Sequence, residues 1–109
     1  MHTKEIIEAT CPDCRGPLSE HRLEGAREYR CLVGHAYSAR TLLQAHSDAQ
    51  EKALWAAVVA LEESANLVEL ITGQLPSVAE RLQQQAETKL RQAAEIRKVI
   101  ENLEPFQTE

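Results

Sequence analysis

The segment YRCLVGHAYS, residues 29–38, places Cys31 and His35 on either side of a glycine-containing turn. Upstream, CPDCRG at residues 11–16 holds the only other two cysteines of the chain. The full spacing is Cys-x2-Cys, then sixteen residues, then Cys-x3-His. Two such pairs on tight turns at the ends of a β-hairpin can surround a zinc ion tetrahedrally. We therefore predict one structural zinc ion per chain, held by Cys11, Cys14, Cys31 and His35.

Other interpretations of these residues are weaker. Cys31 as a buried core thiol and His35 as a polar residue near a helix would need no metal. A redox dithiol at Cys-x2-Cys lacks the surrounding βαβ pattern, and an iron–sulfur cluster prefers a fourth cysteine. His46 is the best alternative fourth ligand, whereas His2 and His21 are expected to be peripheral. Three thiolates and one imidazole fill the four positions of zinc, so we expect a structural site, no catalytic residues and no enzyme.

The first 37 residues predict a small zinc ribbon. The strand-like segments PLSEHRL and REYRCL flank EGA, which predicts a hairpin turning near Gly25, and KEIIEAT is a candidate third strand. Gly16 and Gly34 stand where the metal-binding turns need a positive φ or a close backbone approach. The region has too few large apolar side chains to fold without a disulfide or a bound metal ion that stabilises it.

Residues 38–109 are rich in Ala, Leu, Glu and Gln and have helical periodicity. We predict helices over about 39–72 and 78–103, with Ser38 as the first N-cap and Gly73 as the first stop. Ser77 opens a capping-box spacing before the second helix. Two long helices joined by a short turn form an antiparallel, coiled-coil-like hairpin. The predicted fold class is therefore small α+β, a zinc ribbon followed by a two-helix hairpin.

Apolar residues recur every three or four positions in both helices. If the chain turns near Leu75, two residues that face each other across the hairpin should have sequence numbers that add up to about 150. Helix one extends beyond helix two, so Leu42 and Leu43 are expected to contact the N-terminal region, joined by Phe106. The predicted seam between the helices consists of Leu54, Ala57, Leu61, Ala65, Val68 and Ile71 on one side and Leu82, Ala86, Leu90, Ala93, Ile96, Ile100 and Leu103 on the other.

Val58, Val59 and Leu67 fall outside this seam, which predicts a second apolar face that must be covered. A homodimer that forms a four-helix bundle through the helices would cover it. Trp55, the only tryptophan, is expected to pack within the hairpin or the dimer rather than to anchor an unrelated partner.

Composition limits the remaining possibilities. The chain has 109 residues with 43% hydrophobic and 27% charged residues, which is typical of a folded soluble domain. Its N-terminus lacks the apolar segment of a signal peptide, so we expect a cytoplasmic protein whose thiols stay reduced, with no membrane partner. The net charge of −5 includes a nearly neutral first 37 residues, with five Lys/Arg against six Asp/Glu. This balance does not favour nucleic acid as a partner.

The string CPDCRGPL…YRCLVGHAYSARTLLQAHSDAQEKALWAAVVALEES, over about residues 9–65, resembles the zinc-ribbon-plus-helix tail of some bacterial chemotaxis-type protein-glutamate methylesterases (the CheB family). The resemblance implies a cytoplasmic protein linked to chemotaxis-type signalling and supports the three cysteines and His35 as one ligand set. The catalytic domain of that family, with its serine, histidine and aspartate, is absent from this sequence. Esterase activity is therefore not implied.

Three functions follow from these observations, in order of preference. The first is a non-enzymatic protein–protein interaction or dimerisation module with an unknown protein partner. The second is a zinc-ribbon regulator that binds nucleic acid. Glutamates interleaved with its arginines weaken the positive electrostatic potential that such binding needs. The third is a zinc-dependent enzyme, which would need an open coordination position. The arginines that could contact nucleic acid in the second function are Arg15, Arg22, Arg27 and Arg30.

Overall fold

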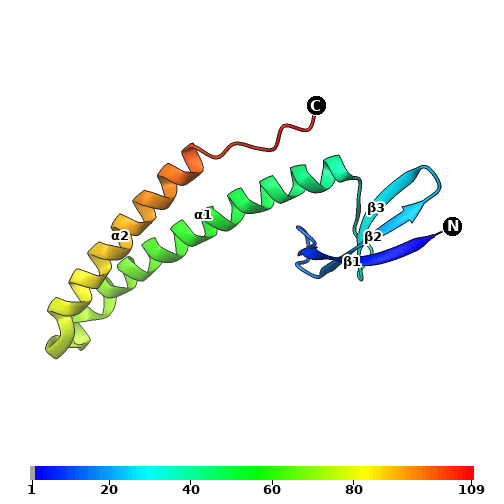
Figure 1. Ribbon diagram of the computed structural model, residues 1–109. Helices are drawn as coiled ribbons and strands as arrows, with labels where there is room; N and C mark the ends of the chain where they lie inside the picture. The colour runs from blue at the N-terminus through cyan, green and yellow to red at the C-terminus, as the bar shows by residue number, and fades with distance from the viewer. Residues whose placement is uncertain (1) are drawn as a thin grey trace. The chain divides into compact units, whose positions relative to one another are not determined.

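The computed structural model describes residues 2–109 and confirms the α+β fold, with an antiparallel sheet followed by two long helices (Figure 1). The chain divides into two compact units, one formed by residues up to Gln50 together with Pro105–Glu109, the other by Glu51–Glu104. The elements in chain order are β1 (Thr3–Thr10), β2 (Pro17–Leu23), β3 (Ala26–Cys31), β4 (Ala36–Tyr37), α1 (Ala39–Ile71), the 3₁₀ turns η1 (Thr72–Gln74) and η2 (Pro76–Val78), and α2 (Ala79–Glu101).

The sheet is a meander in the order β1-β2-β3-β4, with every neighbouring pair antiparallel. The β2–β3 pairing is the predicted hairpin, and Gly25 takes φ 72° in its two-residue turn, a conformation that glycine adopts at little cost. β1 is the third strand, and its register with β2 shifts between Ile6 and Thr10. This irregularity lies just before Cys11, at the point where the chain leaves the sheet.

The core of the sheet unit is very small. Cys11, Leu18 and Cys31 are its buried members, and Leu42 at the start of α1 packs against them as predicted. Leu43 and Phe106 do not belong to this cluster and are 43% and 53% exposed. Near the C-terminus the chain is held instead by polar contacts, such as the Phe106 backbone N–H that donates to the Ser47 hydroxyl at 3.4 Å. Two of the three buried core residues are therefore cysteines.

β2 also buries polar side chains, among them His21, whose ring stacks on that of His2 with centroids 4.9 Å apart. Burial lowers the pKa of His21 below 6.5, and the positive charges of Arg30 and Lys4 add to the effect of His2 while Glu28 opposes it. The folded sheet therefore favours the neutral ring.

Acidification should consequently destabilise the sheet unit. The unfolded chain takes up a proton at His21 near pH 6.5 while the folded chain resists it, so the stability is complete above about pH 6.5 and falls as the pH drops through that value. Denaturant unfolding followed from about pH 7.5 to 5.5 should show a shallower loss in His21→Gln than in the parent chain. Equal slopes would contradict the assignment, because both chains retain the same cysteines and the same His35.

α1 begins as predicted. The Ser38 hydroxyl accepts a hydrogen bond from the Thr41 backbone N–H at 3.1 Å, which satisfies one of the unpaired donors of the first turn. The predicted capping box at Ser77 is wrong, because that residue lies inside η2, Val78 precedes α2, and no side chain caps this helix. Pro76 at the start of η2 and the 3₁₀ turns reverse the chain within a few residues.

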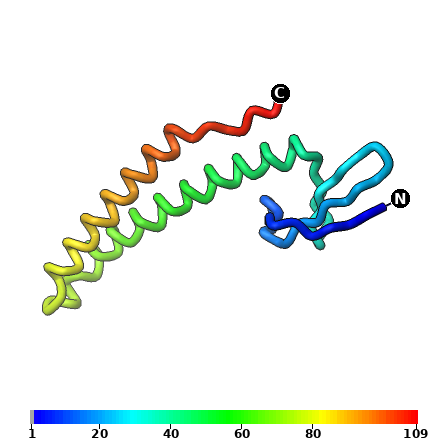
Figure 2. The backbone as a smooth tube through the Cα atoms, in the orientation of Figure 1, coloured from blue at the N-terminus to red at the C-terminus, as the bar shows by residue number. Residues whose placement is uncertain are grey.

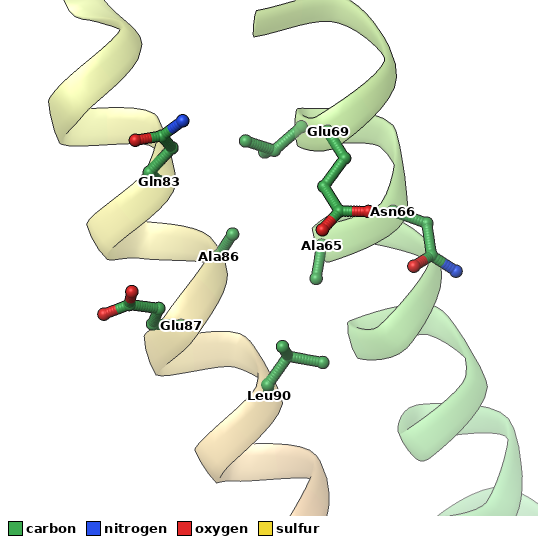
Figure 3. Close-up of a pocket in the computed structure, with 8 residues that line it drawn as sticks. Ala65, Asn66, Glu69, Gln83, Ala86, Glu87 and Leu90 are labelled. Carbon is green, nitrogen blue, oxygen red and sulfur yellow. The ribbon is translucent and has the colours of Figure 1, made fainter.

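The two helices of the second unit run antiparallel (Figure 2). A seam of small side chains lies between them. Its buried residues are Val58 and Ala65 on α1 and Ala86 and Ala93 on α2. Figure 3 shows Ala65 and Ala86 on the facing sides of the two helices, where both line the groove between them. Their numbers sum to 151, as do those of Val58 and Ala93, in agreement with the predicted register.

The prediction assigned Val58 outside the seam, but Val58 is fully buried. Ile71 and Leu90, which were assigned to the seam, are 42% and 48% exposed. Ile71 is the last residue of α1, where the chain turns away. Leu90 borders a shallow groove of about 280 Å³ between the helices, because Ala65 and Ala86 are too small to fill the space beside it (Figure 3).

Trp55 is 41% exposed and contacts α2 through Arg97. The Arg97 guanidinium lies 5.3 Å from the centroid of its ring, and the same guanidinium donates to both carboxylate oxygens of Glu62 at 3.0 and 3.1 Å. The cation–π contact and the ion pair join α1 to α2 at the edge of the seam. Among residues 2–109, no helix combines the length and the apolar character needed to cross a bilayer.

Candidate metal centre

The four predicted ligands lie together at the end of the sheet. Cys11 follows β1, Cys14 lies in the turn before β2, Cys31 ends β3, and His35 precedes β4. The meander brings the two turns together because β2 and β3 pair antiparallel, with Leu18 opposite Cys31. Cys11 and Cys31 are buried, while Cys14 and His35 are half-buried.

Each ligand pair is held by a short backbone turn. The Arg15 N–H donates to the Cys11 carbonyl at 2.8 Å, and the Gly34 N–H donates to the Cys31 carbonyl at 3.2 Å. The predicted glycine conformation is present at Gly34, with φ 109°. In the first turn it is Arg15 that has a positive φ, of 63°, whereas Gly16 does not, and a Cβ atom at Gly16 would lie 3.4 Å from Cys14 Sγ, at the edge of ordinary van der Waals contact.

The ligand atoms converge to the size of a tetrahedral site. His35 Nδ1 lies 3.3 Å from Cys31 Sγ and 3.6 Å from Cys11 Sγ, and the four ligand atoms all lie within 4.8 Å of one another. A tetrahedron with the bond lengths of zinc has edges of about 3.6 Å between nitrogen and sulfur and about 3.8 Å between sulfurs. These residues could therefore bind a metal ion, with the imidazole turned so that Nδ1 faces the sulfurs.

The electrostatics of the cluster favour a cation. Burial would raise the pKa of the Cys31 thiol, but hydrogen bonds from the backbone and ring of His35 lower it to about 6. The backbone N–H of His35 donates to Cys31 Sγ at 3.3 Å. At Cys14 a hydrogen bond from Gly16 lowers the pKa, but burial and the two neighbouring cysteines outweigh it and raise the pKa. A cation at the centre would relieve this repulsion and allow all three thiolates to form.

Tyr37 and Asp13 form an outer layer around Cys11. The Tyr37 hydroxyl lies 3.4 Å from Cys11 Sγ and also donates to the Asp13 carboxylate. Burial and the neighbouring Asp13 raise the pKa of Tyr37, so the hydroxyl keeps its proton. Burial alone would raise the pKa of Cys11, yet the contact with Tyr37 and nearby backbone N–H groups bring it below its ordinary value. The motif spacing did not identify this tyrosine, although it lies only two residues after His35.

Replacing Tyr37 by phenylalanine should weaken metal binding about tenfold, since outer-layer partners of metal ligands typically contribute 10–100-fold. The loss arises because the variant lacks the Tyr37 hydroxyl, which lies 3.4 Å from Cys11 Sγ and also bonds to Asp13. Competition against a chromophoric chelator measures the effect. Tyr29→Phe is the matched control, because Tyr29 pairs with Tyr37 across the strands but belongs to no contact of the cluster. Equal affinities of the two variants would contradict the role of Tyr37.

The remaining histidines have other contacts. His46 Nε2 lies 3.0 Å from the Thr10 carbonyl oxygen, and His2 Nε2 lies 2.7 Å from His21 Nδ1. None of the three belongs to the ligand cluster found among the described residues. His46 instead connects α1 to the end of β1, directly before Cys11.

Comparison with known proteins adds no relative: no protein-family model, no curated protein and no solved structure matches the chain. What the site can do therefore has to be inferred from its own residues.

Proposed function

We propose that this chain is a non-enzymatic zinc protein whose metal stabilises a small ribbon and whose helical hairpin is a protein–protein interaction or dimerisation surface. One observation carries the proposal: Cys11, Cys14, Cys31 and His35 place their ligand atoms within 4.8 Å of one another, in a unit whose buried core holds Leu18 as its only large residue. A core this small needs an additional stabilising element, such as a bound metal ion or a disulfide. Three thiolates with one imidazole suit zinc and leave no position for a substrate or water.

Metal content and stability on one sample test the proposal. We expect one zinc ion per chain, loss of the sheet structure on chelation, and its recovery when zinc is added back. Substitution by cobalt(II) should give the strong visible absorption of a tetrahedral, thiolate-rich site. A well-folded, metal-free protein with reactive thiols would overturn the proposal and make the cysteines candidates for redox chemistry.

Binding to nucleic acid is the weaker proposal. Arg22 and Arg27 both pair with the buried Glu20 at 3.5 Å, and Arg30 pairs with Glu28 at 2.8 Å. Three of the four arginines therefore pair with two glutamates, which lowers the charge that the ribbon offers to phosphates. Absence of DNA and RNA binding at low salt is the expected result, and binding that falls steeply with added salt would reverse the preference.

A link to chemotaxis-type signalling remains a proposal that rests on the sequence resemblance. It is supported only by the order of motifs in residues 9–65, with the ligand pairs followed directly by a long helix. Co-purification with chemotaxis receptors or methylesterases from a bacterial lysate that contains them would support it. Recovery of the chain without any such protein would argue against it.

A further inference from the structure

The shallow groove between α1 and α2 has an apolar floor and two polar walls. Its volume is about 280 Å³, and the small side chains of Ala65 and Ala86 lie at its floor (Figure 3). Leu90 borders this space and is 48% exposed, so its side chain is only partly covered by the hairpin itself. The polar walls are formed by Asn66 and Glu69 on α1 and by Gln83 and Glu87 on α2.

The side of the hairpin that carries this groove, which we call the groove side, continues toward the start of α1. Residues seven positions apart lie on the same side of a helix, because 3.6 residues make one turn. Arg97 shows that the two helices still meet there, since it contacts both Trp55 and Glu62. From Trp55 to Glu69 the groove side covers about four turns, or about 21 Å. Two rows of residues with seven-residue spacing follow it: Trp55, Glu62 and Glu69 on α1, and Gln83, Leu90 and Arg97 on α2.

We propose that the groove side binds a basic amphipathic helix of a protein partner, which lies along the groove as a third helix. The proposal rests on the interaction role proposed above and names the class of partner. An apolar side chain of the partner enters the space beside Leu90. Lysine or arginine residues on the two flanks of the partner helix reach Glu69 on one wall and Glu87 on the other. Helices that bind in grooves present their apolar anchors at spacings of three and four residues.

Charge complementarity selects a basic partner. Within residues 2–109, Glu69 and Glu87 take part in no ion pair, whereas Glu62 on the same side is bound by Arg97. Each wall of the groove therefore keeps one carboxylate without a cation. An acidic helix would place like charges against both walls, which is repulsive. Lysine and arginine also have hydrocarbon stems that cover apolar surface while their charged ends reach the polar walls.

The groove side also offers apolar contacts outside the groove. Trp55 is 41% exposed, and Val59, one turn further along α1, is 49% exposed. Leu90 adds a third partly exposed apolar side chain, two turns before Arg97 on α2. A helix of about four turns therefore meets apolar residues along the groove side as well as the two carboxylates, which is the pattern that an amphipathic helix complements.

Binding of a synthetic helical peptide to the full, zinc-loaded chain tests the proposal. The probe is a labelled peptide of about 18 residues, with leucine at spacings of three and four and lysine on both flanks. A reference peptide carries glutamate in place of every lysine. Fluorescence anisotropy at about 0.15 M salt should show saturable one-to-one binding of the lysine peptide and no binding of the glutamate peptide. Absence of binding by the lysine peptide would overturn the proposal.

Variants with matched controls locate the binding site. Glu87→Lys should weaken binding about tenfold, because it replaces an attraction by a repulsion. Glu63→Lys makes the same charge change outside the groove and should alter the affinity less than about twofold, since salt screens charges beyond about 8 Å. Leu90→Gln should weaken binding about tenfold or more through the lost apolar contact. Leu67→Gln is its control, because Leu67 is 54% exposed and does not line the groove. Equal losses in variants and controls would overturn the assigned site.

Zinc content, circular dichroism and light scattering on the same samples separate this proposal from the function on which it rests. A zinc-loaded, helical monomer that does not bind the lysine peptide would overturn the groove proposal and leave the proposed function standing. A dimer dissociated by Leu90→Gln but not by Leu67→Gln would also overturn it, because a second copy would then occupy the groove. A chain without zinc and without an ordered sheet would instead contradict the proposed function, whatever peptide it binds.

Discussion

Replacing Cys31 by serine is expected to abolish zinc binding and unfold the sheet unit. The change removes one of three thiolates and also the sulfur that accepts the His35 backbone N–H. Structural zinc contributes an apparent 10–16 kcal/mol of binding free energy, about as much as the entire stability of a typical domain. A core with only three buried residues cannot compensate for that loss. Elemental analysis should show zinc falling from one per chain to none.

The helical unit should survive this substitution, because its buried seam contains none of the ligands. Circular dichroism should therefore show most of the helical signal retained while the dispersed amide signals of residues 3–37 are lost from the NMR spectrum. A matched pair of histidine variants controls for general damage. His35→Gln should lose the metal, whereas His46→Gln should keep it and lose only about 1 kcal/mol with its hydrogen bond to Thr10. A zinc-loaded Cys31→Ser protein would contradict the ligand assignment.

Replacing Val58 by aspartate is expected to separate α1 from α2. Val58 is fully buried in the seam, and a carboxylate there would have no partner. Burying an unpaired charge costs several kcal/mol, a large fraction of the 5–15 kcal/mol that stabilises a typical domain. We expect the helical transition in thermal unfolding to fall by tens of degrees or to disappear, while zinc remains bound to the ribbon.

Val99→Asp is the control for this variant, because Val99 is 50% exposed on α2. A surface substitution of this kind typically changes stability by less than about 0.5 kcal/mol. If Val58→Asp unfolded at the same temperature as Val99→Asp, the seam described for residues 51–104 would be wrong.

Much of the architecture could be read from local patterns. Periodic apolar residues indicated two helices, and their summed numbers indicated the register that Ala65 and Ala86 share. Val58 was misplaced because Ala57, Val58 and Leu61 all lie near the same side of the helix, and the pattern alone does not say where the stripe is centred. Ser77 was misjudged because its sequence spacing fits a cap, while the 3₁₀ turns after Ile71 carry the chain past it before α2 begins.

The candidate metal centre shows the same division. Its four ligand types and their spacing are properties of the chain, because only a few residue patterns can close a tetrahedron from two tight turns. The use of His35 Nδ1 and the contact of Tyr37 with both Cys11 and Asp13 depend on how β3 and β4 pair. The spacing of residues along the sequence does not indicate side-chain rotamers or contacts between residues that are far apart in the chain.

The sequence by itself determined the α+β class, the two helices with their approximate register, and the four residues brought together as a candidate metal site. These features depend on local periodicity, caps and ligand spacing, which act over a few residues. Only the tertiary structure decided that Val58 is buried, that Leu43 and Phe106 are exposed, that Arg97 joins Trp55 to Glu62, and that one face of α1 is left uncovered. Burial is a property of what packs against a residue, and that is settled when the elements meet in space.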